Sequence, residues 1–356
     1  MSYAIVNHVI AKMSHRSLRT RAFATPLAVS RSAQRACTLS HFLFLTVAIL
    51  SLLSFAPLRA AEPPITALAF TPDEDSVVVA SQRGVELRSW PELKVIERLK
   101  TGMPHVAHLS FSRFGDKLAV AGGSPGESGR VELYSWPERR LISDDETHGD
   151  VVYDFAWEVD DSWAAASADQ TVSLHWASET KSPTSRVLEG HSRGVTAVVI
   201  LADGKHVISA GLDQSLRVWE FSTGRLLRTL DNHTAAVHAL ALEPPRLGGL
   251  QVLASAGADR TVRIWQPTIG RLVRFARLPA EPLDIAWTPD GNSIVAACSD
   301  GHVRVIDPLT AEVTADVPAI EGWAYCVAIA PDGRHALVGG EGGQLKAVAI
   351  GESGEE

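Results

Sequence analysis

Serine, histidine and aspartate, the side chains of a nucleophilic triad, occur together twice in the middle of the chain. Each set also contains a Trp, and in both sets the Ser-to-Asp spacing is four residues and the Asp-to-Trp spacing is six. The sets are His191, Ser209, Asp213 and Trp219, and His233, Ser255, Asp259 and Trp265. In a hydrolase, such a His activates the Ser as a nucleophile. A single active site does not explain a recurring set, however, and neither Ser lies in a G-x-S-x-G elbow. The pattern therefore favours an architectural role, and we expect no catalytic residue.

Metal and cofactor chemistry has little support in the sequence. There is no H-E-x-x-H, C-x-x-C or C-x-x-C-H motif and no glycine-rich phosphate loop. His105, His108 and His238 have no ligand-type neighbours at helical or hairpin spacing, so we expect packed or surface histidines. We therefore predict no bound metal, no cofactor and no enzymatic activity.

One pattern of apolar strands and turns recurs from Ile65 onward. The last apolar residue of each first strand marks a unit: Phe70, Phe111, Trp157, Ile200, Leu242, Trp287 and Ile329. Successive markers are 41, 46, 43, 42, 45 and 42 residues apart. Alternation of apolar and polar residues between turns indicates half-buried strands, and this period is typical of four-stranded propeller blades. The sequence predicts an all-β fold, a seven-bladed β-propeller over residues 62–350, followed by an acidic tail at 351–356.

Two of the units resemble a known family. Residues 190–219 read GHSRGVTAVVILADGKHVISAGLDQSLRVW, and residues 232–265 read NHTAAVHALALEPPRLGGLQVLASAGADRTVRIW. Both resemble WD-repeat proteins of the transducin-beta type, whose blades carry Gly-His before the first strand and a Trp-Asp-like end to the third. In that family one His, one Ser or Thr, one Asp and one Trp form a hydrogen-bonded line through a blade. The resemblance assigns this role, which we call a tetrad, to the two sets above.

The other units depart from the tetrad pattern. The third unit has His148 and Asp169, but His175 stands where the Trp is expected and Trp176 follows it. The sixth unit keeps Asp300, and the first and second lack the turn Asp. We expect these blades to share the fold and to be less rigid, because a satisfied polar network stiffens a blade.

The end of the chain bears on how the ring closes. The seventh unit stops after its third strand, at residues 344–350. Propellers of the family usually complete the last blade with a strand from the other terminus. Two arrangements are therefore open: a last blade of three strands, or a fourth strand supplied by residues around 54–64.

The first 61 residues have the character of a targeting segment. They contain seven Lys and Arg residues and no Asp or Glu, and an uncharged apolar run of fourteen residues at 42–55 precedes the small residues Ala60 and Ala61. This order predicts a secretory signal peptide with a long basic region, starting at Met1 or Met13. The run is shorter than the ~20 residues of a membrane helix. We expect an exported protein, periplasmic or secreted, or a membrane anchor at 42–55 if the segment is retained.

Composition and charge limit the class of partner. Hydrophobic residues make up 46% and charged residues 21%, as in globular proteins. Beyond residue 61 the chain has 26 basic and 41 acidic residues, a formal charge of −15. Such a domain repels phosphate backbones, so we expect no nucleic-acid partner, and membrane contact only through a retained N-terminal segment. Cys298 and Cys326 lie in apolar strand patterns, which predicts small buried side chains without a disulfide.

The resemblance implies a non-enzymatic scaffold that binds other proteins or peptides through the propeller faces. In the family, peptides usually bind the face that carries the Gly-His turns, where the candidates are Arg193, Glu281, Trp323 and Tyr325. Arg and aromatic side chains in loops are typical partner anchors, although packing between adjacent blades fits Trp323 and Tyr325 as well. Two alternatives stay open: a lactonase-like enzyme or small-molecule sensor working at the central channel, and a module of a larger enzyme assembly.

Overall fold

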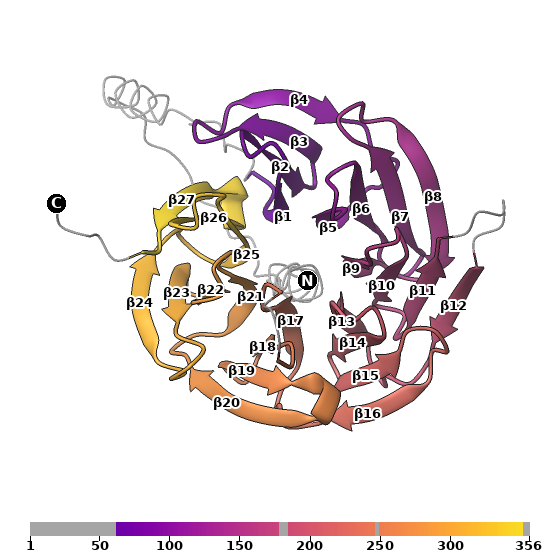
Figure 1. Cartoon of the computed structure of the whole chain (residues 1–356). Helices are drawn as coiled ribbons and strands as arrows, with labels where there is room; N and C mark the ends of the chain where they lie inside the picture. Colours follow the sequence, from indigo (N-terminus) through magenta and orange to yellow (C-terminus); the bar gives the residue numbers. More distant parts are fainter. Residues whose placement is uncertain (1–61, 178–183, 246–248, 352–356) are drawn as a thin grey trace, which may run out of the picture.

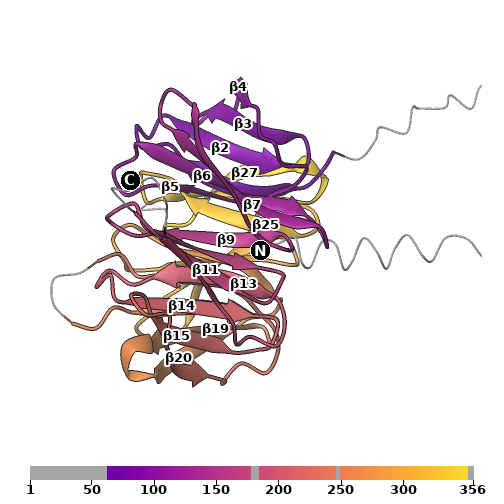
Figure 2. The same ribbon diagram turned by 90° about the vertical axis from the view of Figure 1, so that its right-hand side faces the viewer.

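The computed structural model describes residues 62–177, 184–245 and 249–351. These residues form seven antiparallel sheets arranged in a ring around a central axis (Figure 1). Seen from the side, the ring is a disc, and the strands run between its two faces (Figure 2). The all-β, seven-bladed prediction is confirmed.

Strands follow the chain from the axis outward in every blade. Blade one contains β1 (Ile65–Phe70), β2 (Ser76–Ser81), β3 (Gly84–Ser89) and β4 (Val95–Leu99), and blade two contains β5 (Val106–Phe111), β6 (Lys117–Ser124), β7 (Ser128–Ser135) and β8 (Leu141–His148). Blade three contains β9 (Val152–Trp157), β10 (Trp163–Ser167), β11 (Val172–Trp176) and β12 (Thr184–Leu188), and blade four contains β13 (Val195–Ile200), β14 (His206–Gly211), β15 (Leu216–Glu220) and β16 (Leu226–Leu230). Blade five contains β17 (Val237–Leu242), β18 (Leu253–Gly257), β19 (Thr261–Gln266) and β20 (Arg271–Arg277), and blade six contains β21 (Pro282–Trp287), β22 (Ile294–Cys298), β23 (His302–Ile306) and β24 (Val313–Pro318). Blade seven contains β25 (Ala324–Ile329), β26 (His335–Gly340) and β27 (Leu345–Ala349).

The sequence period gives the correct strand ends. All seven first strands end at the residue that marked the unit in the sequence. The second strands are mostly apolar, and WAAAS of β10 and IVAAC of β22 are buried at every residue. A strand covered on both sides needs this kind of continuous apolar run. The fourth strands form the rim, and β4 exposes most of its residues. Two short 3-10 helices, η2 (Pro267–Ile269) and η3 (Glu341–Gly343), lie in turns.

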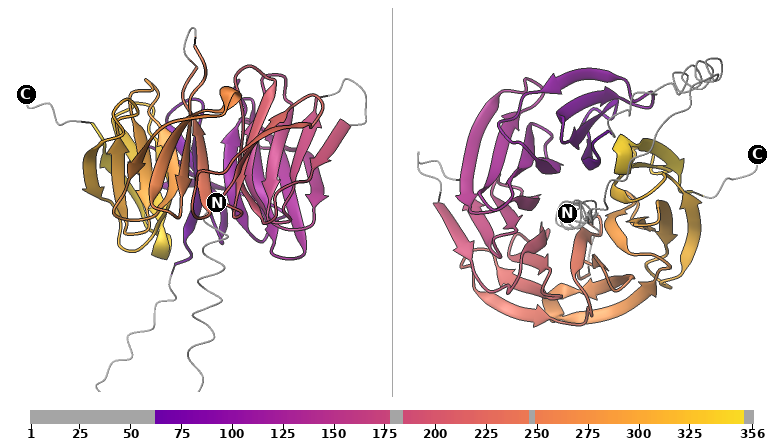
Figure 3. Two further views of the ribbon diagram at one scale, coloured as in Figure 1. Left: turned by 90° about the horizontal axis from the view of Figure 1, so that it is seen from below. Right: turned by 180° about the vertical axis from the view of Figure 1, so that it is seen from behind.

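Turns alternate between the two edges of an antiparallel sheet, so the disc has two distinct faces. Turns that precede a first strand, or join a second strand to a third, lie on one face. We call it the Gly-His face, because it carries His191 and His233. Turns that follow a first or a third strand lie on the opposite face, and the side view separates the two faces (Figure 3, left).

Every first strand is bulged at its second residue, next to the Gly-His face. The bulged residues are Thr66, Ala107, Tyr153, Thr196, His238, Leu283 and Tyr325. A bulge re-aims its side chain and bends the strand. Here it turns hydroxyls toward the next blade: Thr66 Oγ1 donates to the carbonyl of Val106, and Thr196 Oγ1 to that of Val237, both at 2.7 Å. In blades one and four, the bulge therefore joins the blade to its neighbour near the axis.

The ring closes by direct packing of blade one on blade seven. The last blade has three strands, which confirms one of the two predicted arrangements, and residues 62–64 form no strand. A Cβ on Gly339 would lie 2.5 Å from Ile65 Cγ2 and 2.8 Å from Cys326 Sγ. Only glycine therefore allows β1 to approach β26 this closely.

The structure also tests the cysteine prediction. Cys298 and Cys326 are buried and unpaired, and they belong to separate apolar clusters. The predicted targeting segment at residues 1–61 and most of the acidic tail lie outside the described residues. In the described part of the chain, no helix has the length and apolarity needed to cross a membrane.

Candidate functional site

The two predicted tetrads are present in blades four and five. In blade four, His191 Nδ1 lies 3.0 Å from Asp213 and Nε2 lies 2.8 Å from Ser209 Oγ, and the Trp219 indole N–H donates to the same Oγ at 2.8 Å. Blade five repeats this geometry with distances of 3.0, 2.7 and 2.8 Å. A neutral His that donates from Nδ1 and accepts at Nε2 satisfies every member of the line. Each tetrad thus ties a turn of the Gly-His face to the blade interior.

Burial and hydrogen bonding set the charges of the tetrads. Burial alone would raise the pKa of Asp213 and Asp259, but hydrogen bonds from His191 and His233 hold the pKa of each well below its ordinary value. Burial lowers the pKa of His233. Ser209 and Ser255 have no exposed surface. Neither serine can reach a substrate, so the geometry supports an architectural role for both sets.

Blade three contains a third line that sequence analysis identified only in part. His148 Nδ1 lies 3.0 Å from Asp169, and its Nε2 lies 2.9 Å from Ser173 Oγ. This Ser comes from β11, whereas the tetrad serines come from second strands. Ala165 holds the second-strand position and pairs directly with Ser173. In blade three the hydroxyl therefore comes from the third strand instead of the second. In the sequence, Ser173 stands at the position where the tetrad blades have Arg217 and Arg263.

His175, at the Trp position of blade three, is buried and stacks on Trp163. The ring centroids are 3.5 Å apart and the planes 9° apart. Its Nδ1 lies 3.8 Å from Asp145 Oδ2, and its Nε2 has no hydrogen-bond partner among the described residues. Burial lowers the pKa of His175 to about 4, with Asp145 opposing the shift. The imidazole is therefore neutral at pH 7.

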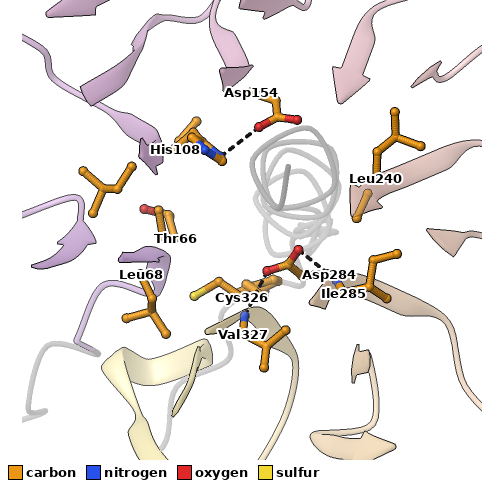
Figure 4. Close-up of a pocket in the computed structure, with 14 residues that line it drawn as sticks. Thr66, Leu68, His108, Asp154, Leu240, Asp284, Ile285, Cys326 and Val327 are labelled. Atoms are coloured by element: carbon orange, nitrogen blue, oxygen red, sulfur yellow. Dashed lines mark hydrogen bonds and ion pairs between the residues drawn. The ribbon is translucent and has the colours of Figure 1, made fainter. Parts of the chain in front are cut away.

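The third residues of the first strands are Ala67, His108, Asp154, Ala197, Ala239, Asp284 and Cys326. All of them except Ala197 line a cavity at the hub of the ring, where Figure 4 shows His108, Asp154 and Asp284. Asp154 accepts the backbone N–H of Val198 from the next blade at 2.8 Å, and Asp284 accepts that of Val327 at 2.9 Å. Each carboxylate also accepts the N–H of its own following residue. Both aspartates therefore clamp one blade to the next.

The hub carboxylates differ in their cationic partners. His108 Nδ1 lies 2.9 Å from Asp154 Oδ1, whereas no basic side chain pairs with Asp284 within the described residues. Burial raises the pKa of Asp284 to about 6. His108, Asp154 and Asp284 all line a cavity of about 190 Å³. The sequence signal for the two clamps is YDFAW in β9 and LDIAW in β21, which share an Asp and a Trp at the same strand positions.

The tryptophans of these two strands form hydrogen bonds to the preceding blade. The Trp157 indole N–H donates to the carbonyl of Ser110 at 3.2 Å, and that of Trp287 to the carbonyl of Ala241 at 3.0 Å. Blades three and six are thus bonded to both neighbours. No group of three or more His, Cys, Asp or Glu residues within the described ranges is placed to hold a metal ion.

The four candidate partner-binding residues lie at or next to the Gly-His face, but they do not form one cluster. Arg193 is exposed in the turn before β13. Glu281 hydrogen-bonds to the buried His238, a partner that sequence analysis did not foresee. Trp323 and Tyr325 have ring centroids 6.1 Å apart, and Tyr325 packs with Leu283 of blade six. Tyr325 therefore makes the inter-blade contact that was its alternative interpretation, and Trp323 is half-buried beside it.

Comparison with known proteins identifies the repeat. The family described as "WD domain, G-beta repeat" matches residues 182–220, 224–266 and 279–307, which run from β12 of blade three to β23 of blade six and leave out β20. Periodic tryptophan protein 2 homolog of Caenorhabditis elegans is 24% identical over 47% of this chain and 18% of its own length. Protein HIR1 of Mycosarcoma maydis is 33% identical over 32% of this chain, and nuclear distribution protein PAC1 of Arthroderma otae is 33% identical over 23%. The matched part spans 11% and 19% of those two relatives, less than a fifth of any of the three. The chain thus carries WD40 repeats within a seven-bladed β-propeller.

Proposed function

We propose that this protein is a non-enzymatic scaffold that binds other proteins or peptides on the faces of its propeller. The observation that carries the proposal is the use of its Ser, His and Asp sets. Three blades have such a set, and in each the His is buried and bonded to both a carboxylate and a hydroxyl. Residue types that form catalytic triads in hydrolases are here used to fix the turns. A rigid disc with well-placed turns is suited to recognition.

Partner capture with a face-specific control tests this proposal. The full-length protein is cross-linked in extract of its native host, purified and analysed by quantitative mass spectrometry beside Arg193→Ala and Trp323→Ala. We expect a reproducible set of proteins, with some members lost in one of the two variants. A protein that captures nothing, and that turns over a small substrate instead, would contradict the scaffold.

We also propose that the scaffold is exported, to the periplasm or outside the cell, with a membrane anchor at 42–55 as the alternative. The support is the order of basic, apolar and small residues in the first 61 positions. Cell fractionation with mass spectrometry of the N-terminus tests the location. A start near Ala61 in the soluble exported fraction supports cleavage, an intact segment in the membrane fraction supports the anchor, and cytoplasmic protein with an intact N-terminus contradicts export.

A second candidate, a small-molecule sensor or enzyme at the channel, is favoured by one observation. Asp284 has no ion-pair partner in the described part of the chain and faces the hub cavity beside the His108–Asp154 pair. Metal analysis and a thermal-shift screen with small cationic and neutral compounds test it. A stoichiometric divalent ion, or a saturable shift that Asp284→Asn abolishes, favours this candidate over the scaffold.

A further inference from the structure

Two hub carboxylates occupy equivalent positions in different blades. Asp154 is the third residue of β9 in blade three, and Asp284 is the third residue of β21 in blade six. Each carboxylate accepts one backbone N–H from its own strand and one from the next blade, at 2.8 to 2.9 Å. Because the two aspartates are held in the same way, a difference between their surroundings shows what one of them lacks.

The difference comes from the blade that precedes each aspartate. His108, the third residue of β5, places its Nδ1 2.9 Å from Asp154 Oδ1. The equivalent residue before Asp284 is Ala239, the third residue of β17. A methyl group therefore stands where the other pair has an imidazole. Among the described residues, His108 is the one basic side chain that lines the hub cavity, and it is paired with Asp154.

The hub cavity is large enough for a small organic ion. Its volume is about 190 Å³, and both Ala239 and Asp284 line it. An apolar protein cavity of about 150 Å³ can hold benzene. Figure 4 shows Asp284 at the edge of this space, bonded to the backbone of the next blade. Large aliphatic residues from five blades also line the cavity: Leu68, Leu109, Leu240, Ile285 and Val327.

The acceptor capacity of Asp284 selects a cation with an N–H group. An ionised carboxylate offers about four acceptor sites, and Asp284 uses two of them on backbone N–H groups. Its counterpart Asp154 fills a third site with an imidazole nitrogen. Burial raises the pKa of Asp284 to about 6, so the carboxylate is mostly ionised at pH 7, and a bound cation would lower this pKa again.

Other cations fit the cavity less well. A divalent metal ion needs several protein ligands, and no group of three or more His, Cys, Asp or Glu residues converges in the described part of the chain. A quaternary ammonium ion has no N–H to donate to the carboxylate. The aliphatic side chains of the wall favour a cation with a short apolar body.

We propose that the hub cavity binds a short alkylammonium group, which pairs with Asp284 as His108 pairs with Asp154. The group is either a free small molecule or the end of a Lys side chain, since both present the same chemistry. The inference rests on the second candidate function, for which it names the ligand class, and the scaffold does not depend on it. A charge-assisted N–H bond inside a cavity gives the pairing its strength.

Titration calorimetry of the full-length protein with butylammonium chloride tests the site. We expect saturable binding of one ion per chain. Asp284→Asn should weaken it by about tenfold or more, because the charge is lost. Ala239→His is the decisive variant, since it leaves the carboxylate and its backbone bonds in place and supplies an imidazole of the protein's own. It should abolish binding, whereas Asp73→Asn, which removes an exposed carboxylate outside the cavity, should bind as the parent does.

The reverse substitution tests the equivalence of the two aspartates. His108→Ala leaves Asp154 without its imidazole, so we expect a second butylammonium ion per chain. Thermal unfolding shows whether each variant is folded. A folded His108→Ala protein that still binds a single ion would refute the equivalence on which the inference rests.

Further probes identify the source of the ammonium group and the outcomes that overturn the proposal. An acetylated tripeptide amide with a central Lys that binds more tightly than butylammonium assigns the site to a partner's side chain, and weaker binding assigns it to a free amine. No saturable binding, or binding that Ala239→His leaves unchanged, would overturn the site. Tetramethylammonium that binds as tightly as butylammonium would overturn the N–H pairing. A neutral compound that binds where no cation does would keep the channel candidate and reject this ligand class, and the capture experiment tests the scaffold separately.

Discussion

Each tetrad serine joins two hydrogen bonds, and this makes it the most sensitive member of the line. Ser255 Oγ accepts from the Trp265 indole N–H and lies 2.7 Å from His233 Nε2, inside a blade with no access to water. Loss of the hydroxyl leaves two buried polar groups without a partner, whereas loss of an exposed hydroxyl leaves none. The cost of a buried unsatisfied group exceeds the value of the bond itself.

The first prediction concerns this serine. Ser255→Ala should lower the free energy of unfolding by about 1–3 kcal/mol, because the His233 and Trp265 nitrogens lose their shared partner. Chemical denaturation followed by tryptophan fluorescence measures the change. Ser192→Ala removes an exposed Ser next to the other tetrad and should change stability by less than about 0.5 kcal/mol. Equal effects of the two substitutions would show that the tetrad does not stabilise the blade.

The second prediction tests the displaced hydroxyl of blade three. Ser173→Ala should destabilise the protein by about 1–3 kcal/mol, because His148 Nε2 loses its partner. Adding Ala165→Ser places a hydroxyl on the second strand, directly opposite residue 173. Ser209 holds the equivalent position in blade four. The double variant should recover most of the lost stability in denaturant unfolding. If the double variant is no more stable than Ser173→Ala, the two positions are not equivalent.

At the scale of the element, repetition determines what a single sequence can predict. Strand ends and the seven blades follow from alternation and spacing within one unit, and both tetrads follow from the resemblance of two units to WD-repeat proteins, so all of them can be predicted from the chain. The Asp154 and Asp284 clamps and the pairing of His238 with Glu281 join residues about one blade apart. Their contacts depend on how the sheets stack around the axis, and local patterns do not encode that stacking. Sequence analysis did not predict the bond between Ser173 and His148, because the blade still contains a Ser and only the strand that carries it differs.

The third prediction concerns the pH dependence of blade three. His175 has a folded-state pKa of about 4, below its ordinary value near 6.5, because burial disfavours the cation. The unfolded chain therefore binds more protons between these values. The contribution to stability is fully present above about pH 6.5 and is lost as the pH falls toward 4. His175→Phe keeps an aromatic ring against Trp163 and removes the titration, so its stability should fall less over this range.

The difference between the two proteins is the quantity to measure, because other groups titrate nearby. The raised pKa of Asp284 removes stability as the pH rises from about 3.8 to about 6, the opposite sign to His175. The lowered pKa of Asp169, Asp213 and Asp259 costs stability only below about pH 4. These groups are common to both proteins. Parallel curves of unfolding free energy against pH, from pH 4 to 7, would refute the assignment to His175.

At the scale of the whole molecule, the ring is held by contacts that differ from seam to seam. Tetrads act within blades four and five and the His148–Asp169–Ser173 line acts within blade three, while the Asp and Trp clamps act at blades three and six. The seam between blades seven and one has no fourth strand to share, and it depends on close packing of β1 against β25 and β26. This seam is where we expect the ring to open first.

The fourth prediction tests that seam through Gly339, whose missing side chain lets Ile65 and Cys326 approach. Gly339→Ala would place a Cβ within 3 Å of both side chains, so blade one must move outward, at a cost of about 1–3 kcal/mol. Hydrogen exchange should accelerate in β1, β26 and β27 while β14 and β18 stay protected, because the outward shift weakens packing only at the closing seam. Gly149→Ala is the matched control, since a Cβ there meets no atom within 4 Å. Uniform acceleration in all blades would mean that the ring unfolds as one unit, and unchanged exchange in β1 would mean that this packing does not close it.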